Sequence, residues 1–142
     1  MFYNIMLHAH SGLRWLVLIA LIIALFQTFS RRGTAGQIME TKSALFTLIL
    51  THLQLIVGII LYVISPKVTF GANTMSDSIF RFFTMEHFVG MVIAVVLITL
   101  GYSKAKKAEL PFNKVFNYYI IAFILILIFI PWPFRALGAG WF

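Results

Sequence analysis

The 142-residue sequence contains no cysteine, and this absence excludes several kinds of site. Disulfide bonds, thiolate metal sites and iron–sulfur clusters all require cysteine sulfur. Any metal in this protein must therefore be held by histidine, methionine, glutamate or aspartate side chains. The chain has only four histidines and four acidic residues, so the choice of ligands is narrow.

Acidic residues are outnumbered by basic ones, with four Asp and Glu against eleven Lys and Arg, which gives a net charge of +7. In a soluble protein this excess would point to nucleic acid. Here most of the basic residues stand beside long apolar runs, where the positive-inside bias of membrane proteins explains them. We therefore expect a lipid bilayer as the partner and no nucleic acid.

Charge of either sign is rare overall: 61% of the residues are hydrophobic and 11% are charged. The apolar residues form four runs of roughly the 20 residues that a helix needs to cross a bilayer. We predict an all-α integral membrane protein with one domain, residues 1–142, folded as an up-down-up-down four-helix bundle. The predicted spans are about 3–29, 43–64, 82–104 and 112–130, with Ser76-Asp77 as a helix cap and prolines at several ends.

The basic residues divide unevenly between the two ends of such a bundle. One end carries Arg31, Arg32, Lys42, Lys104, Lys106, Lys107 and Lys114. The other end keeps Lys67, Arg81 and Arg135, with Arg14 inside the first span. The positive-inside rule then places both termini outside the cytoplasm, on the periplasmic side of a bacterial inner membrane.

Only a few ionisable side chains interrupt the spans, and they include every histidine of the chain. Ionisable residues inside a membrane usually face the bundle interior and mark a function. This concentration is the strongest functional signal in the sequence. The residues are His8, His10, Arg14, His52, Glu86 and His87.

Histidines on different spans are the ligands that hold b-type haem in membrane bundles. With a rise of about 1.5 Å per residue, His52 lies near the middle of its helix, His87 further out and His10 near the outer end. Helix tilt can bring neighbours in this series level, so His87 can meet either His10 or His52, with His8 as the alternate. We expect one haem b, and the sequence leaves open whether a second haem is bound.

Two further residues would suit a haem site. Gly90 lies one turn beyond His87, where a missing side chain gives a flat macrocycle room to approach the backbone. Arg14 lies four residues after His10, on the same helical face, and can pair with a haem propionate. Arg14 can equally extend to the outer interface as a snorkelling side chain.

A different class of function is an ion site for copper, zinc or iron. If the segment His8-Ala9-His10 were extended, its two imidazoles would point the same way and could hold one ion together with His52 and His87. We rank this second, because the apolar residues before His8 favour a continuous helix. A third possibility is an accessory subunit whose bundle only packs against a larger complex.

No catalytic residues can be assigned. The sequence has no Ser–His–Asp set and no phosphate-binding glycine loop, which favours an electron-transfer protein over a stand-alone catalyst. Glu86 points about 100° away from His87 on a helix, so we interpret it as a partner for Arg14 or Arg81, or as a proton-handling group.

The segments HAHSGLRWLVL, THLQLIVGIILY, MEHFVGMVIAVVLITLGYSK and PWPFRALGAGWF together resemble small four-span membrane proteins of Bacteroidota that are labelled cytochrome b-like. The resemblance covers most of the chain. It implies haem b on span histidines and electron transfer with quinone and with a redox partner or larger respiratory complex. The matching positions are His10, His52 and His87, with His8 as alternate. Whether the protein forms a homodimer is open.

Overall fold

The structure is a computed structural model, and it describes residues 1–141. These residues form helices and turns, with no strand among them. In chain order the elements are α1 (Phe2–Ser30), a 3₁₀ turn η1 (Ile38–Glu40), α2 (Lys42–Ile64), α3 (Ser78–Arg81), a π-helical turn η2 (Phe82–Glu86), α4 (His87–Ala105), α5 (Pro111–Phe129) and a 3₁₀ turn η3 (Pro133–Arg135).

Four of the helical segments are long and apolar enough to cross a membrane: Phe2–Ser30, Lys42–Ile64, Ser78–Ala105 and Pro111–Phe129. Each matches a predicted span to within a few residues. Their outward faces carry large exposed apolar side chains, such as Phe26, Ile56 and Ile128. These side chains suit a lipid environment, and the protein is a multi-pass membrane protein of the predicted bundle type.

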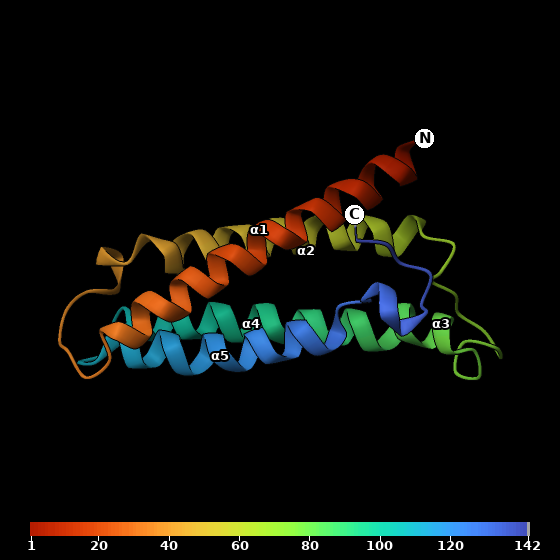
Figure 1. Cartoon of the computed structure of the whole chain (residues 1–142). Helices are drawn as coiled ribbons and strands as arrows, with labels where there is room; N and C mark the ends of the chain where they lie inside the picture. Colours follow the sequence, from red (N-terminus) through yellow and green to blue (C-terminus); the bar gives the residue numbers. More distant parts are fainter. Residues whose placement is uncertain (142) are drawn as a thin grey trace.

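The spans pack as two antiparallel hairpins, α1 with α2 and α4 with α5 (Figure 1). Further contacts join α1 to α5 and α2 to α4, so the four spans form a ring in chain order. Both termini lie at one end of this bundle, and the α1–α2 and α4–α5 loops lie at the other (Figure 1). This is the up-down-up-down arrangement expected from short connections.

The third helix begins at Ser78, directly after the predicted Ser76-Asp77 cap, and its first turn precedes the predicted span at residue 82. The Asp77 carboxylate accepts hydrogen bonds from the backbone N–H groups of Ile79 and Phe80, at 2.8 and 3.0 Å. These bonds satisfy two of the N–H groups that every helix start leaves unpaired. The helix then widens into the π-helical turn η2 directly before His87.

The tightly packed core occupies the half of the bundle near the α1–α2 and α4–α5 loops. Small residues allow the close approach there, as is usual between membrane helices: Ala24, Ala94 and Ala122 are completely buried. Tyr119 is also fully buried, and its hydroxyl donates a hydrogen bond of 2.8 Å to the Ala44 carbonyl of α2. The opposite half of the bundle is hollow.

Candidate functional site

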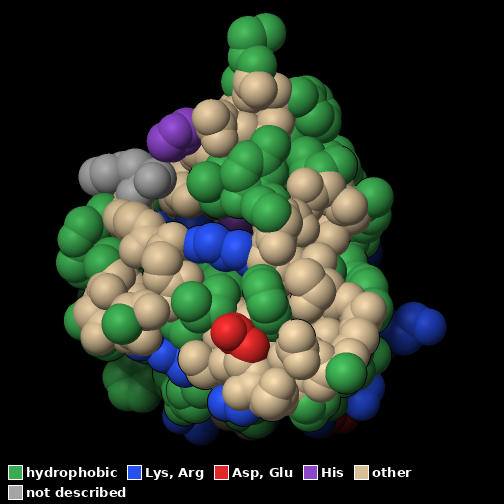
Figure 2. Space-filling view, turned by 90° about the vertical axis from the view of Figure 1, so that its right-hand side faces the viewer, with side chains coloured by type: hydrophobic (Ala, Val, Ile, Leu, Met, Phe, Trp, Pro, Cys, Tyr) green, Lys and Arg blue, Asp and Glu red, His purple; other side chains and the backbone are tan. Residues whose placement is uncertain are grey.

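A cavity of about 190 Å³ lies between the spans at the end of the bundle where both termini lie. Side chains of α1, α2, α4 and α5 line it, as do Lys67 after α2 and Gly138–Gly140 near the C-terminus. One buried water needs only about 10–15 Å³ of such space, so the cavity can hold a guest of many atoms. Figure 2 views this end of the molecule, where Lys and Arg side chains lie at the centre of the surface.

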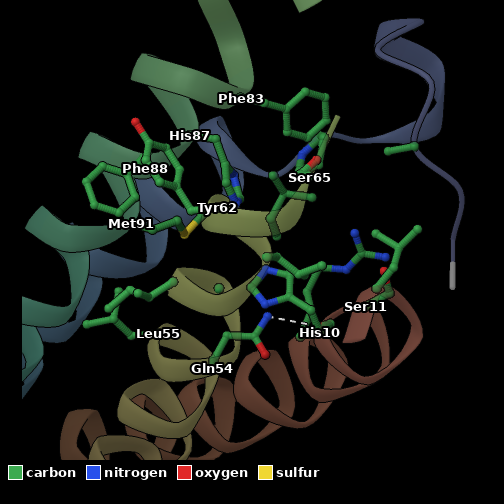
Figure 3. Close-up of a pocket in the computed structure, with 18 of the residues that line it drawn as sticks. His10, Ser11, Gln54, Leu55, Tyr62, Ser65, Phe83, His87, Phe88 and Met91 are labelled. Atoms are coloured by element: carbon green, nitrogen blue, oxygen red, sulfur yellow. Dashed lines mark hydrogen bonds between the residues drawn. The ribbon is translucent and has the colours of Figure 1, made fainter. Parts of the chain in front are cut away.

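The rings of His10 and His87 approach each other from opposite sides of this cavity (Figure 3). Their centroids are 6.2 Å apart, and the ring planes are inclined by 75°. His10 lies eight residues after Phe2 and His87 nine residues after Ser78, where their two spans begin at the same end of the bundle. The two residues therefore lie at nearly the same depth, and the structure brings His87 to His10 rather than to His52.

The ring of His87 is held by a backbone carbonyl. Its Nδ1 lies 2.7 Å from the carbonyl oxygen of Phe129, the last residue of α5. A carbonyl can only accept, so Nδ1 carries the proton and Nε2 is left as a lone-pair donor. Metal-bound histidines are usually oriented by this kind of bond.

The sequence after α5 explains why the Phe129 carbonyl is available. In a continuing helix it would accept from residue 133, which is a proline without an N–H group. The neighbouring carbonyls are also satisfied by side chains, since Trp132 bonds to Leu127 and Arg135 bonds to Ile128. The prolines after α5 thus leave the Phe129 carbonyl without a backbone donor, and His87 donates to it instead.

The π-helical turn η2 fixes the start of α4 against α2. The Tyr62 hydroxyl of α2 donates a 2.9 Å hydrogen bond to the carbonyl of Thr84, inside this turn. The Thr84 hydroxyl in turn accepts from the backbone N–H of Thr69, at 3.1 Å. Single π-helical turns within α-helices are frequent at functional sites.

His10 is positioned by α2. The amide of Gln54 donates a 2.9 Å hydrogen bond to the His10 backbone carbonyl, linking α1 to α2 beside the cavity (Figure 3). One turn further along α2, a side chain at Gly58 would place its Cβ only 3.1 Å from Cε1 of His10. The His10 Nδ1 atom is buried without a hydrogen-bond partner among the described residues.

Two cations line the cavity. The Arg14 side chain is only 8% exposed, and one of its terminal nitrogens donates a 2.6 Å hydrogen bond to the Trp141 carbonyl. Lys67 donates to the carbonyls of Leu137 and Gly138. Burial lowers the pKa of the Lys67 ammonium below its usual value. Arg14 therefore does not snorkel into open water, and both cations are bound to the C-terminal segment.

The other charged residues near this end are paired elsewhere. Arg81 forms an ion pair with Glu86 at 2.9 Å, which confirms one of the partners expected for Glu86. Arg135 donates to the carbonyls at the end of α5 and lies over the Phe82 ring. None of these three charged side chains lines the cavity.

The other two histidines do not join the pair. His8 is exposed on the surface of α1, which is a continuous helix through this segment, so the extended arrangement of His8 and His10 is not formed. The His52 ring bonds to the Leu48 carbonyl at 2.7 Å and faces Thr99 of α4 at 3.4 Å. No three metal-ligating side chains come together within residues 1–141.

Gly90 does not provide the room expected of it. It is buried away from the cavity lining, and any Cβ at this position would overlap the ring of Phe129. The missing side chain lets α5 pack closely on α4, beside the bond between His87 and the Phe129 carbonyl. The glycine that allows close approach at the cavity is Gly58.

Sequence reasoning missed Gln54, Lys67 and the C-terminal segment as parts of the site. Gln54 has no charge and so was not among the ionisable candidates, although a single amide in the middle of an apolar span is itself unusual. Lys67 entered only the count of basic residues at one end of the bundle. The positions of residues 138–140 depend on how the chain folds back after η3, which no local pattern shows.

Comparison with known proteins adds nothing to these observations: no family model, curated protein or solved structure matches the chain. The class of protein is thus defined by the fold and the cavity, as a four-span membrane bundle with two histidines facing one another in its hollow half.

Proposed function

We propose that the protein is a membrane cytochrome that binds one haem b through His10 and His87. The observation that carries the proposal is the facing pair of imidazoles in a cavity lined by all four spans. When bound, haem supplies one-electron transfer chemistry.

The separation of the two rings fits ligation of a common metal. If two imidazoles held one metal ion between them, their centroids would lie about 6.3 Å apart, given metal–nitrogen bonds of about 2.0–2.1 Å. The separation between His10 and His87 is 6.2 Å. The hydrogen bond from His87 Nδ1 to Phe129 leaves Nε2 as the ligating atom.

The donor set favours haem over a bare ion. Structural zinc takes four protein ligands and catalytic zinc usually three, whereas a haem brings four ring nitrogens of its own and would need only His10 and His87 from the protein. Within residues 1–141, His10 and His87 face each other, and no cluster of three His, Asp or Glu side chains surrounds them. One pair also supports one haem rather than two.

The location of the cavity indicates where electrons would pass. The excess of basic residues at the opposite end favours a cytoplasmic position for that end, which would put the cavity toward the periplasmic face of a bacterial inner membrane. We propose that His10 and His87 hold the redox group where quinol in the outer half of the bilayer and a partner at the outer face can both approach. No residue of the chain is assigned to acid–base chemistry in this function.

Purification in detergent followed by absorption spectroscopy tests the proposal. We expect a Soret band that shifts on reduction with dithionite and one haem per chain. His10→Ala and His87→Ala should each remove the low-spin spectrum. His8→Ala and His52→Ala are matched controls that should keep it, because these two rings lie away from the pair.

The alternatives give different results. A colourless protein with stoichiometric copper or zinc would replace the cytochrome with an ion-binding protein. If the purified protein contains neither metal nor pigment, even after haem is added, the remaining hypothesis is an accessory subunit of a larger complex. Full colour in His87→Ala would contradict the ligand assignment.

A further inference from the structure

The cavity has an unbalanced charge. Arg14 and Lys67 line it, and no acidic residue does so among the residues that the structure describes. The four acidic residues of the chain lie elsewhere: Glu40 pairs with Arg31, Glu86 pairs with Arg81, Asp77 caps a helix, and Glu109 lies in the loop before α5. A guest that carries negative charge would balance the two cations.

Arg14 is the stronger indication of the two. Arg14 is 8% exposed, and its Nε atom is buried with no hydrogen-bond partner within residues 1–141. A buried guanidinium is costly unless its N–H groups are satisfied, and a carboxylate satisfies two of them at once. Arg14 also lies one helical turn after His10, on the same face of α1.

We infer that Arg14 and Lys67 form a carboxylate-binding pair for the guest that His10 and His87 ligate. This inference rests on the proposed function and specifies the chemistry of the guest: a flat metal macrocycle with acidic side groups on the edge toward the C-terminal segment. Arg14 binds one carboxylate and Lys67 the other.

The C-terminal segment gives the spacing between the two cations. Arg14 bonds to the carbonyl of Trp141 and Lys67 to that of Gly138, three residues earlier in the chain. Three residues span at most about 10–11 Å, so both cations lie along one edge of the cavity. Arg14 uses only one terminal nitrogen for the Trp141 carbonyl, so its Nε remains able to donate to a carboxylate while the C-terminal segment stays bound.

A comparison of haem b with its dimethyl ester tests the role of Arg14 and Lys67 in the unaltered protein. Haem-free protein in detergent is titrated with haem b and with its dimethyl ester, which keeps the iron and the ring but lacks both negative charges. We expect haem b to bind about ten- to a hundredfold more tightly, as befits charge-assisted hydrogen bonds. Both should give the same low-spin spectrum, because the axial ligands are unchanged.

Substitution of the cations provides the matched experiment. Arg14→Gln and Lys67→Gln should each weaken haem b binding and leave binding of the ester nearly unchanged. Lys107→Gln removes the same charge at the opposite end of the bundle and should alter neither affinity. A preference for haem b that persists in the double variant Arg14→Gln/Lys67→Gln would overturn the assignment.

The outcomes separate this inference from the proposed function. If the unaltered protein binds both compounds equally with a low-spin spectrum, the carboxylate pair is wrong and the cytochrome stands. If it binds neither, the proposed function fails and the inference fails with it.

Discussion

The imidazole of His87 donates from Nδ1 to the carbonyl oxygen of Phe129, 2.7 Å away, and so joins the first residue of α4 to the last residue of α5. The bond holds the ring whose centroid lies 6.2 Å from that of His10 across the cavity. It exists because a helix that ends before two prolines leaves a carbonyl unpaired. The orientation of a candidate ligand thus depends on the sequence 42 residues further along the chain.

Gly58→Ala should weaken haem binding without unfolding the protein. The new Cβ would lie 3.1 Å from Cε1 of His10, so the imidazole must move by a few tenths of an ångström. We expect a loss of affinity of about tenfold, comparable to other changes that misorient a metal ligand. Haem titration measures the affinity, and thermal unfolding should show no loss of stability.

Gly12→Ala is the matched control for this experiment. It is also a glycine inside a helix of the same hairpin, yet nothing lies within 4 Å of its Cβ position. We expect unchanged affinity and a gain of roughly 0.5–1 kcal/mol in helix stability. Equal effects of the two substitutions on haem binding would show that Gly58 has no role at the site.

Gly90→Ala should destabilise the bundle. Its Cβ would overlap the Phe129 ring, so α4 and α5 must separate or the ring must turn. Overpacking of this kind costs about 1–3 kcal/mol. Thermal unfolding in detergent measures the loss, and an unfolding temperature equal to that of the original protein would mean that α4 and α5 do not pack as described.

Haem affinity should fall at high pH because of Lys67. Burial lowers its pKa, so the folded protein loses this positive charge at a lower pH than an exposed lysine would. The attraction for a carboxylate is lost over the same range. The lowered pKa makes folding more favourable, not less, as the pH rises through it, so unfolding would not explain the decrease.

Lys67→Arg gives the comparison for this pH dependence. Arginine keeps its charge throughout the range, so the affinity of the variant should stay level where that of the original protein declines. Titrations at a series of alkaline pH values measure both curves. Parallel curves would exclude Lys67 as the titrating group.

The direction of the protein in the membrane can be tested with introduced cysteines, since the chain has none of its own. Met75→Cys lies in the exposed loop before α3 and Lys107→Cys in the loop before α5. In intact bacterial cells with a permeable outer membrane, an impermeant thiol reagent should label the first and not the second. Labelling of Lys107→Cys alone would reverse the proposed orientation.

The fold follows from the sequence to a large degree, because long apolar runs, prolines and the Asp77 cap are local signals that determine where the four spans begin and end.

The site could be predicted only in part. Depth along each helix left His87 within reach of two partners. In the structure the third helix begins at Ser78, so His87 lies nine residues and His10 eight residues from the starts of their spans, at nearly the same depth.

Contacts between distant segments were the least predictable. Gly90 was expected to give room to a ring, but sequence does not show that Phe129 fills that space. Gln54 and Lys67 reach the cavity through the crossing of α1 over α2 and the return of the chain after η3. Residues that act through such tertiary contacts carry no signal in their own neighbourhood.

Electron paramagnetic resonance of the oxidised, purified protein tests most directly whether His10 and His87 share one iron. We expect a low-spin ferric signal of an iron with two imidazole ligands, at one iron per chain. This signal should convert to a high-spin signal, or vanish with the haem, in both His10→Ala and His87→Ala. A low-spin signal that survives either substitution, or protein that contains no iron after haem is supplied, would contradict the account.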